Sequence, residues 1–269
     1  RDKRFRIAMS HAINRQEMME LLYPGWDMKI AQVSPSSGSP CYYEPLEKQY
    51  LEYDPQKANQ LLDEMGLDKR DESGWRLRPD GKILAFTMEV PNFTKIWIDT
   101  SELIIRYWQK VGVKATLKVE DPGLWSLRCI QTGEHDGTFC GCGDDDQPLL
   151  SFREYVPIRQ EWGINLAAPL WGLWHQTGGK SGEEPPPEMK KVMELYDTIV
   201  TTIDREKQIE LAREIVKINA ENFWIGGICR RPGKLLLVKN YVRNVPENLR
   251  ATHWFEAAPG NSCQYFFER

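Results

Sequence analysis

The spacing of apolar residues along the chain predicts a series of helices. Apolar side chains recur every three or four residues, the pattern of one buried helical face, in segments at about 5–12, 14–24, 54–66, 95–110, 124–131, 167–175, 188–200 and 205–220. Asn14 with Glu17 forms a capping pair for the second helix, and Asp54 followed by Pro55 starts the third. Gly66 and Gly112 follow two of these segments, as expected at helix ends.

Shorter apolar runs between these helices predict strands. They lie at 83–90, 113–119 and 138–140, with two further strand-like pieces at 223–228 and 235–238. Because the helix at 95–110 separates the first two strands, the three elements form a crossover unit and indicate an α/β fold. The stretch 32–45 is rich in Ser, Pro and Gly and is expected to be a long surface loop, either bordering a cleft or simply connecting two elements.

Composition sets limits on fold and partners. A chain of 269 residues that is 41% hydrophobic and 28% charged can bury one large core or two modest ones. Its formal net charge is -4, and its pI is near 5.7. Nucleic acid is therefore not an expected partner, because neutralising phosphates takes a clustered excess of Lys and Arg.

Nothing in this segment predicts a membrane span or an export signal. No apolar run approaches the roughly 20 residues needed to cross a bilayer, and the basic start of the chain is not followed by an apolar stretch. The absence of an initiator Met suggests that the segment comes from a longer protein.

The six cysteines give no metal-ligand pattern. They stand at positions 41, 129, 140, 142, 229 and 263, and Cys140 and Cys142 are too close for a CxxC pair. A site built from His135, Asp136, Cys140, Cys142 and Asp144 would have suitable donors but no repeated ligand spacing. We therefore expect no metal and no cofactor, and the cysteines are either buried free thiols or include one disulfide.

The most informative local feature is the turn GCGDDDQP at 141–148, which places three consecutive carboxylates directly after a predicted strand. Ligand sites in open α/β sheets favour the carboxyl ends of strands. Gly141, Gly143, Asp144 and Asp145 are accordingly candidate ligand-binding residues. The alternative is an exposed acidic turn without a ligand.

Several tryptophans cluster in sequence around this turn. Flat indole faces stack on sugar rings and on peptide side chains. Trp171 and Trp174, three residues apart on one helical face, are the first candidates, and Trp125 is a third. The alternative for each is a place in the hydrophobic core.

Four stretches carry a resemblance to a known family. They are DKRFRIAMSHAINR at 2–15, YDPQKA at 53–58 with Leu61 and Leu62, YWQKVGV at 107–113, and GEHD at 133–136. Their joint order and spacing resemble the family 5 extracellular solute-binding proteins, which include the oligopeptide- and dipeptide-binding proteins of bacterial ABC importers.

The resemblance implies one lobe of a two-lobed clamp. The expected fold is an α/β, periplasmic-binding-protein-like (type II) lobe with a mixed sheet flanked by helices, the first lobe being largely missing. Residues 1–228 would form the second lobe, and residues 229–269 would be a C-terminal return segment that belongs to the first lobe.

The resemblance also implies a role for the acidic turn. It is similar to the family's Gly-Trp-x-Gly-Asp-x-x-Asp-Pro element, in which the first Asp, here Asp144, pairs with the α-ammonium of a peptide. The family's Trp falls on Gly141, and the loop PNFT at 91–94 has no Arg where dipeptide binders clamp a carboxylate. Longer peptides or uncharged sugars are thus better expectations than dipeptides. The segment 171–187 looks like a subgroup of larger members.

The expected function is the substrate-binding component of an ABC-type importer, which binds a peptide or oligopeptide-like solute and delivers it to the membrane permease. The alternative is an oligosaccharide-binding member of the same family. The expected location is extracytoplasmic, with membrane association only through the permease or a lipid anchor outside this segment. An enzyme is not expected, because adjacent carboxylates in one turn do not flank a scissile bond and no GxSxG, HExxH or P-loop pattern is present. A pure interaction module, using the exposed cleft face, is a third possibility.

Overall fold

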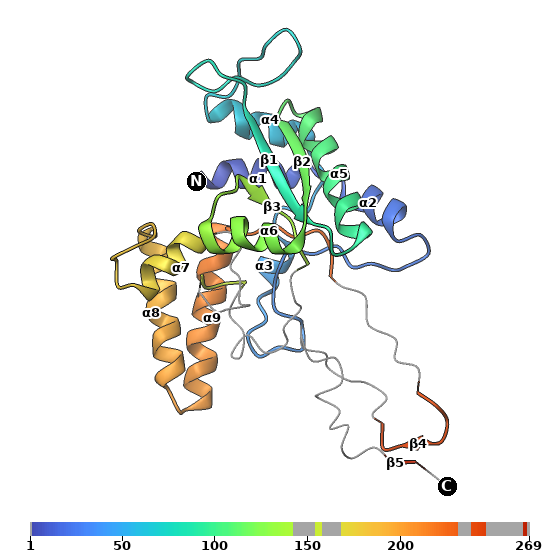
Figure 1. The fold of residues 1–269 in the computed structure, drawn as a ribbon, viewed down its shortest axis with the longest axis vertical. Helices are drawn as coiled ribbons and strands as arrows, with labels where there is room; N and C mark the ends of the chain where they lie inside the picture. The colour runs from blue at the N-terminus through green and yellow to red at the C-terminus, as the bar shows by residue number, and fades with distance from the viewer. Residues whose placement is uncertain (1, 142–153, 158–167, 231–237, 246–265, 268–269) are drawn as a thin grey trace.

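A small parallel sheet and its covering helices form the centre of the molecule (Figure 1). The computed structural model describes residues 2–141, 154–157, 168–230, 238–245 and 266–267. The elements run in the order α1 (Lys3–His11), α2 (Arg15–Leu22), α3 (Glu44–Lys48), α4 (Pro55–Glu64), β1 (Ala85–Pro91), α5 (Lys95–Lys110), β2 (Lys114–Glu120), α6 (Pro122–Trp125), the π-helix η1 (Ser126–Thr132), β3 (Gly137–Thr138), α7 (Pro169–Gln176), α8 (Pro187–Thr201), α9 (Arg205–Asn222), β4 (Val242–Arg243) and β5 (Phe266–Phe267).

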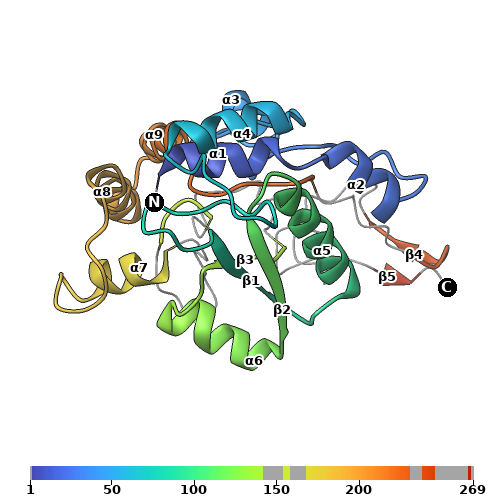
Figure 2. The same ribbon diagram turned by 90° about the horizontal axis from the view of Figure 1, so that it is seen from above.

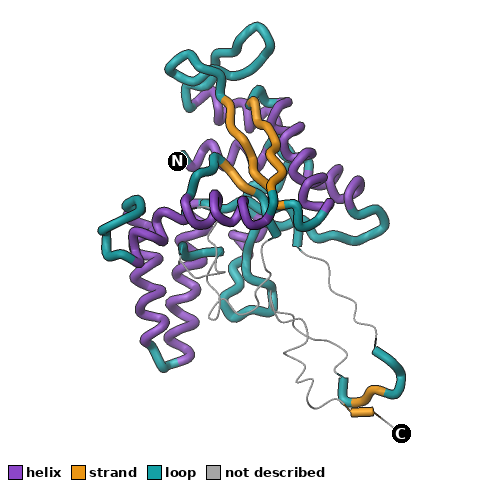
Figure 3. The backbone as a smooth tube through the Cα atoms, in the orientation of Figure 1, coloured by secondary structure: helices purple, strands orange, loops and turns teal. Residues whose placement is uncertain are grey.

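The central sheet has the strand order β2-β1-β3, and all three strands run parallel. β1 and β2 pair from Ala85 opposite Lys114 to Pro91 opposite Glu120, with α5 as the crossover helix between them. This confirms the predicted strand-helix-strand unit and the α/β class. β4 and β5 pair antiparallel in a separate two-stranded sheet, away from the central sheet (Figure 3).

The two faces of the sheet have different neighbours. Helices α1, α4 and α5 lie on one side and α6 on the other (Figure 2). Phe86 and Met88 of β1 pack into the apolar clusters made with the first set of helices. Successive residues of a strand point to opposite faces of the sheet, so Glu89, which follows Met88, points away from these helices. Its side chain lies toward η1, where it pairs with Arg128. The sheet therefore carries an apolar face and a charged one.

A second core lies outside the sheet. Helices α8 and α9 run side by side (Figure 1), and Met189, Val192 and Ile215 pack there with Leu46 of α3. The chain thus follows the second of the two compositional expectations, with separate modest cores rather than one large one.

The strand predicted at 223–228 does not form. Phe223 ends α9 in the left-handed region, with φ 52°, and turns the chain across residues 29–33. A Cβ at Gly227 would lie 2.6 Å from the Val33 nitrogen, so the two segments approach closely, yet they share only the isolated bridge between Ile30 and Cys229. The apolar pattern suggested a strand that pairs along its length with a neighbour. In the structure, side chains instead supply most of the hydrogen bonds where the two segments cross. Of the other strand-like piece, 235–237 lie outside the described residues, and Val238 is not in a strand.

Arg15 is the main side chain that holds this crossing. It is 2% exposed, and its guanidinium donates to the carbonyl oxygens of Gly227 at 3.0 Å, Ser10 at 3.0 Å and Leu51 at 3.3 Å. Burial lowers the pKa of Arg15 to about 10. Gln32 completes the network, because its Oε1 accepts from the Gly227 nitrogen at 2.6 Å.

Glu47 anchors the other end of the crossing. Its side chain is fully buried, and its carboxylate accepts from Lys29 at 3.0 Å, from Arg230 at 2.6 Å and from the Tyr42 hydroxyl at 2.7 Å. Burial alone would raise the pKa of Glu47, but hydrogen bonds from Tyr42, Lys29 and Arg230 outweigh it and hold the pKa below its usual value.

Arg15→Met is expected to lower the free energy of unfolding by about 2–5 kcal/mol, because it leaves buried carbonyls without a donor. Arg4→Met on the exposed side of α1 is the matched control and should cost no more than about 1 kcal/mol. Urea unfolding followed by circular dichroism measures both. Equal costs for the two variants would contradict a bracing role for Arg15.

Glu47 should make the free energy of unfolding depend on pH in the acidic range. Because its folded pKa lies below the unfolded value, its contribution is present above about pH 4.5 and is lost as the pH falls further. Glu47→Gln is therefore expected to destabilise the protein by about 3–5 kcal/mol at pH 7, with a difference from wild type that shrinks in acid. Urea unfolding from pH 7 to pH 3 tests this, and a pH-independent difference would refute it.

Candidate functional site

The loops that leave the carboxyl ends of the three parallel strands meet at one edge of the sheet. The Asn92 nitrogen, after β1, donates to the carbonyl of Glu120 at the end of β2 at 3.0 Å. The Phe139 nitrogen, after β3, donates to the carbonyl of Glu89 at 3.1 Å. Backbone hydrogen bonds therefore fix the loops at 91–94, 120–121 and 139–141 relative to one another. This edge is where an open α/β sheet places its ligands.

An aromatic pair stands at this edge. Phe93 is 58% exposed, and its ring meets Trp97, in the first turn of α5, edge to face with centroids 5.7 Å apart. Thr94 caps that helix by accepting from the Trp97 nitrogen at 3.4 Å. Sequence reasoning did not select Phe93 or Trp97. Their position immediately after the first strand of a crossover unit was the signal that could have found them.

Gly141 lies against Trp97 of this pair. A Cβ built on Gly141 would stand 2.7 Å from Cζ2 of Trp97, so the indole fills the space where a side chain at position 141 would begin. The position where the family motif carries Trp is thus a glycine here, with an indole from α5 beside it. Gly143, Asp144 and Asp145 lie outside the described residues.

Trp125 belongs to the interior. It is 4% exposed, and its indole nitrogen donates to the Thr138 hydroxyl at 2.9 Å. Its ring packs in the fold and leaves almost no face for a solute, which is the core alternative considered for it above.

Trp171 and Trp174 project from α7 and are both half-buried. The indole nitrogen of Trp171 donates to Glu183 at 3.1 Å. The ring of Trp174 lies under the Lys190 ammonium, 5.2 Å from its centroid, and Lys190 also pairs with Glu184.

Trp171 lines a pocket of about 450 Å³, a volume within the range of small-molecule sites. The other residues around this pocket are Arg6, Glu183, Glu184, Pro185, Pro186, Pro187, Lys190 and Trp224. Two indoles and two charges of each sign give it an apolar wall and a balanced polar rim.

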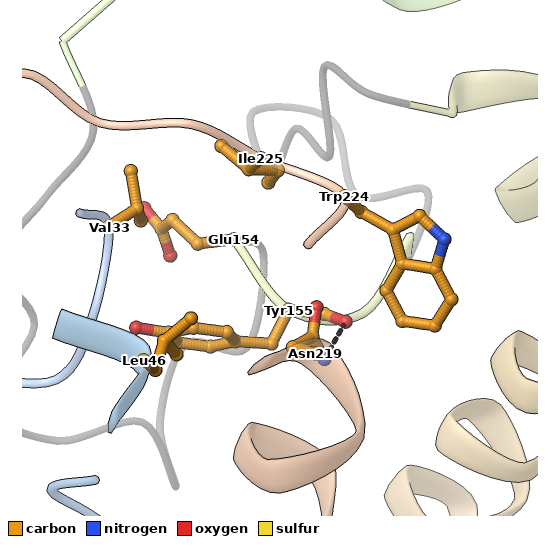
Figure 4. A pocket seen from close by; sticks show the side chains of 7 residues that line it. All are labelled: Val33, Leu46, Glu154, Tyr155, Asn219, Trp224 and Ile225. Atoms are coloured by element: carbon orange, nitrogen blue, oxygen red, sulfur yellow. Dashed lines mark hydrogen bonds between the residues drawn. The ribbon is translucent and has the colours of Figure 1, made fainter. Parts of the chain in front are cut away.

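Trp224 also borders a much smaller cavity of about 10 Å³ (Figure 4). Asn219 donates to the Tyr155 carbonyl there at 3.0 Å, and Val33, Leu46, Glu154 and Ile225 complete the lining. A space of this size holds about one water molecule. It is a packing gap between α3, α9 and the chain crossing rather than a solute site.

The metal-ligand set considered in the sequence is not assembled in the described part of the chain. Asp136 accepts from the Thr87 nitrogen at 3.0 Å, and His135, Asp136 and Cys140 do not come together as a group of three donors. Cys142 and Asp144 lie outside the described residues.

The parallel sheet with its covering helices is an α/β fold of the kind that places ligands at the carboxyl ends of its strands. Residues 1–162, more than half of the chain, match the family model described as bacterial extracellular solute-binding proteins, family 5 Middle. The chain therefore belongs to the family 5 extracellular solute-binding proteins.

Individual relatives agree with this assignment. The solved oligopeptide-binding protein OppA is 34% identical, covers 100% of this chain and 44% of its own, and superposes with a TM-score of 0.80. The periplasmic alpha-galactoside-binding protein of Rhizobium meliloti is 22% identical over 90% of this chain and 34% of its own length. MelB of Agrobacterium fabrum, solved with stachyose, shares the fold with a TM-score of 0.66 at 19% identity, over 84% of this chain and 33% of its own.

The chain spans less than half the length of each of these relatives. Their names describe solute-binding proteins rather than enzymes. Family membership places the chain outside the cytoplasm, as the sequence led us to expect. In the described part of the chain, the helices are too short or too polar to span a bilayer.

Gly141→Ala is expected to disturb the edge, because the new methyl group must displace Trp97. We expect a loss of about 1–3 kcal/mol in unfolding free energy and a change in tryptophan fluorescence. Gly137→Ala is the matched control, since nothing lies within 4 Å of its Cβ, and should stay within about 0.5 kcal/mol of wild type. In a Trp97→Ala background the cost of Gly141→Ala should largely disappear. An undiminished cost would show that Trp97 is not the obstacle.

Proposed function

We propose that this chain is the second lobe of the substrate-binding component of an ABC-type importer. The whole protein binds a peptide or oligopeptide-like solute between two lobes and hands it, chemically unaltered, to the membrane permease. The observation that carries the proposal is the carboxyl edge of the parallel sheet, where Gly141 opens the acidic turn beside Phe93 and Trp97. Membership of the solute-binding family supports the same reading.

The division of the chain into 1–228 and 229–269 is part of this proposal. The chain crosses residues 29–33 at Ile30 and Cys229, and Arg15 and Glu47 brace it on either side. Among the described residues, the part after this crossing adds no strand to the central sheet, since β4 pairs with β5. A braced crossing of this kind suits a hinge, about which two lobes rotate to enclose a ligand.

Asp144 is the proposed anchor for a peptide's α-ammonium. A carboxylate that faces an ammonium in a closing cleft forms a charge-assisted bond where screening is weak. The adjacent loop offers Phe93 and no arginine, so it suits apolar contact with a longer peptide better than a clamp for a dipeptide carboxylate. Gly143 and Asp145 would give the turn its shape and added negative charge.

An oligosaccharide is the second candidate solute. The pocket between Trp171 and Trp224 favours it, because two indoles with two acidic and two basic neighbours suit a neutral, hydroxyl-rich ring. Relatives named for alpha-galactosides and solved with stachyose point the same way. Trp174, under Lys190, would support the wall of this pocket rather than line it.

Calorimetry of the full-length protein tests the anchor. Asp144→Asn is expected to weaken binding of a peptide with a free amino terminus by about 2–5 kcal/mol, the usual cost of breaking a buried charge pair. Asp146→Asn removes the same charge from the same turn and should have a much smaller effect.

Acetylation of the peptide's amino terminus adds a second control. It should weaken binding to wild type but leave binding to Asp144→Asn nearly unchanged, since the pair is already broken. Equal losses on acetylation in both proteins would remove Asp144 as the anchor. Binding of a galactose-containing oligosaccharide instead of any peptide would favour the second candidate.

A further inference from the structure

A buried cluster beneath the carboxyl edge has no part in the proposed function. Glu89 of β1, Glu120 at the end of β2 and Cys129 of η1 are 3%, 5% and 0% exposed. Parallel pairing sets Glu89 beside Lys118 and Pro91 beside Glu120, so both carboxylates lie on the charged face of the sheet, where η1 covers them. One carboxylate oxygen from each Glu and the Cys129 sulfur all lie within 4.8 Å of one another.

The two cations of the cluster occupy only one oxygen of each carboxylate. Arg128 forms an ion pair with Oε1 of Glu89 at 2.9 Å and donates to Oε1 of Glu120 at 2.8 Å, and Lys118 also pairs with Oε1 of Glu120. The second oxygen of each carboxylate has a different environment. Oε2 of Glu89 accepts from the Cys129 thiol at 3.3 Å, and Oε2 of Glu120 is buried and receives no hydrogen bond from an N–H or O–H donor among the described residues, although the two carboxyl groups lie against each other. A buried carboxylate oxygen without a partner is costly and calls for an occupant.

We propose that Glu89, Glu120 and Cys129 form a binding site for a divalent cation of the zinc class. Donors of one tetrahedral Zn²⁺ site lie roughly 3.3–3.8 Å apart, so the sulfur and Oε2 of Glu89 are already at the required separation. The thiol excludes Ca²⁺ and Mg²⁺ as preferred ions, because these take oxygen ligands. Water would complete the fourth position.

The surroundings suit such an ion. Arg128 would stay in place and orient both carboxylates from outside, as hydrogen-bonded partners of metal ligands do. Its side chain is 26% exposed, so solvent reaches the cluster on this side.

The backbone around Cys129 is itself unusual. Ser126–Thr132 form a π-helix, a rare geometry that is frequent at functional sites. It turns both Arg128 and Cys129, which are adjacent in sequence, toward the two carboxylates. Because the site lies wholly within this lobe, it goes beyond the proposed function and does not depend on the identity of the solute.

Cobalt titration tests the site. Tag-free, full-length protein is stripped with a chelator and titrated with Co²⁺, which reports thiolate ligation through a ligand-to-metal charge-transfer band. We expect one equivalent to bind with this band and to be displaced by Zn²⁺. Cys129→Ser should abolish the band, and Glu120→Gln and Arg128→Lys should each weaken binding by about tenfold to 100-fold. Cys41→Ser, which alters another buried thiol, is the matched control and should retain wild-type affinity and the band.

Three results would overturn the proposal. They are wild-type protein that shows no sulfur charge-transfer band, a band that survives Cys129→Ser or is lost in Cys41→Ser, and unchanged affinity in Glu120→Gln. If the Cys129 variant does not fold, wild-type protein decides the question, because Zn²⁺ must raise its unfolding midpoint in a concentration-dependent way. Absence of that shift would leave the cluster as an ionic brace only.

Discussion

The buried guanidinium of Arg15 makes the hydrogen bonds on which the arrangement of the fold depends. Where two chain segments cross without a strand ladder, their buried carbonyls must find donors elsewhere. Arg15 supplies them to residues 10, 51 and 227 at once, joining the first helices to the far end of the chain. The cost of burying this cation is offset by several charge-assisted hydrogen bonds. The position of Trp224, and hence of both pockets it borders, follows from this crossing.

Much of the fold could be predicted because its signals are local. Asp54 with Pro55 caps α4, Thr94 caps α5, and the helix expected at 95–110 has those bounds in the structure. The failure at 223–228 has a tertiary cause. The apolar run there suggested a strand, whereas Phe223 adopts a left-handed conformation and Gly227 passes close to Val33, neither of which periodicity can reveal. The helix expected at 124–131 formed, but the spacing of apolar residues did not indicate its π geometry.

Part of the candidate site could be predicted from the sequence. Gly141 lies at the carboxyl edge because it follows a parallel strand, which the crossover unit already implied. Exposure was harder to infer from the sequence, since Trp125, one of the tryptophans around the acidic turn in the sequence, lies in the interior. Glu89, Glu120 and Cys129 share no ligand spacing. Only the register of β1 with β2 and the geometry of η1 bring them together, and no sequence motif indicates either of these.

The π-helix has a further consequence for how this part of the chain tolerates change. Each backbone hydrogen bond of a π-helix spans one residue more than a hydrogen bond of an α-helix does. Deleting a single residue from η1 would favour ordinary α-helical geometry, in which successive side chains lie about 100° apart, so the directions of Arg128 and Cys129 relative to the sheet would change. Arg128 and Cys129 are therefore positioned by the length of the segment as well as by their chemistry. The deletion of one residue from this segment would therefore alter the charged face of the sheet more than most substitutions would.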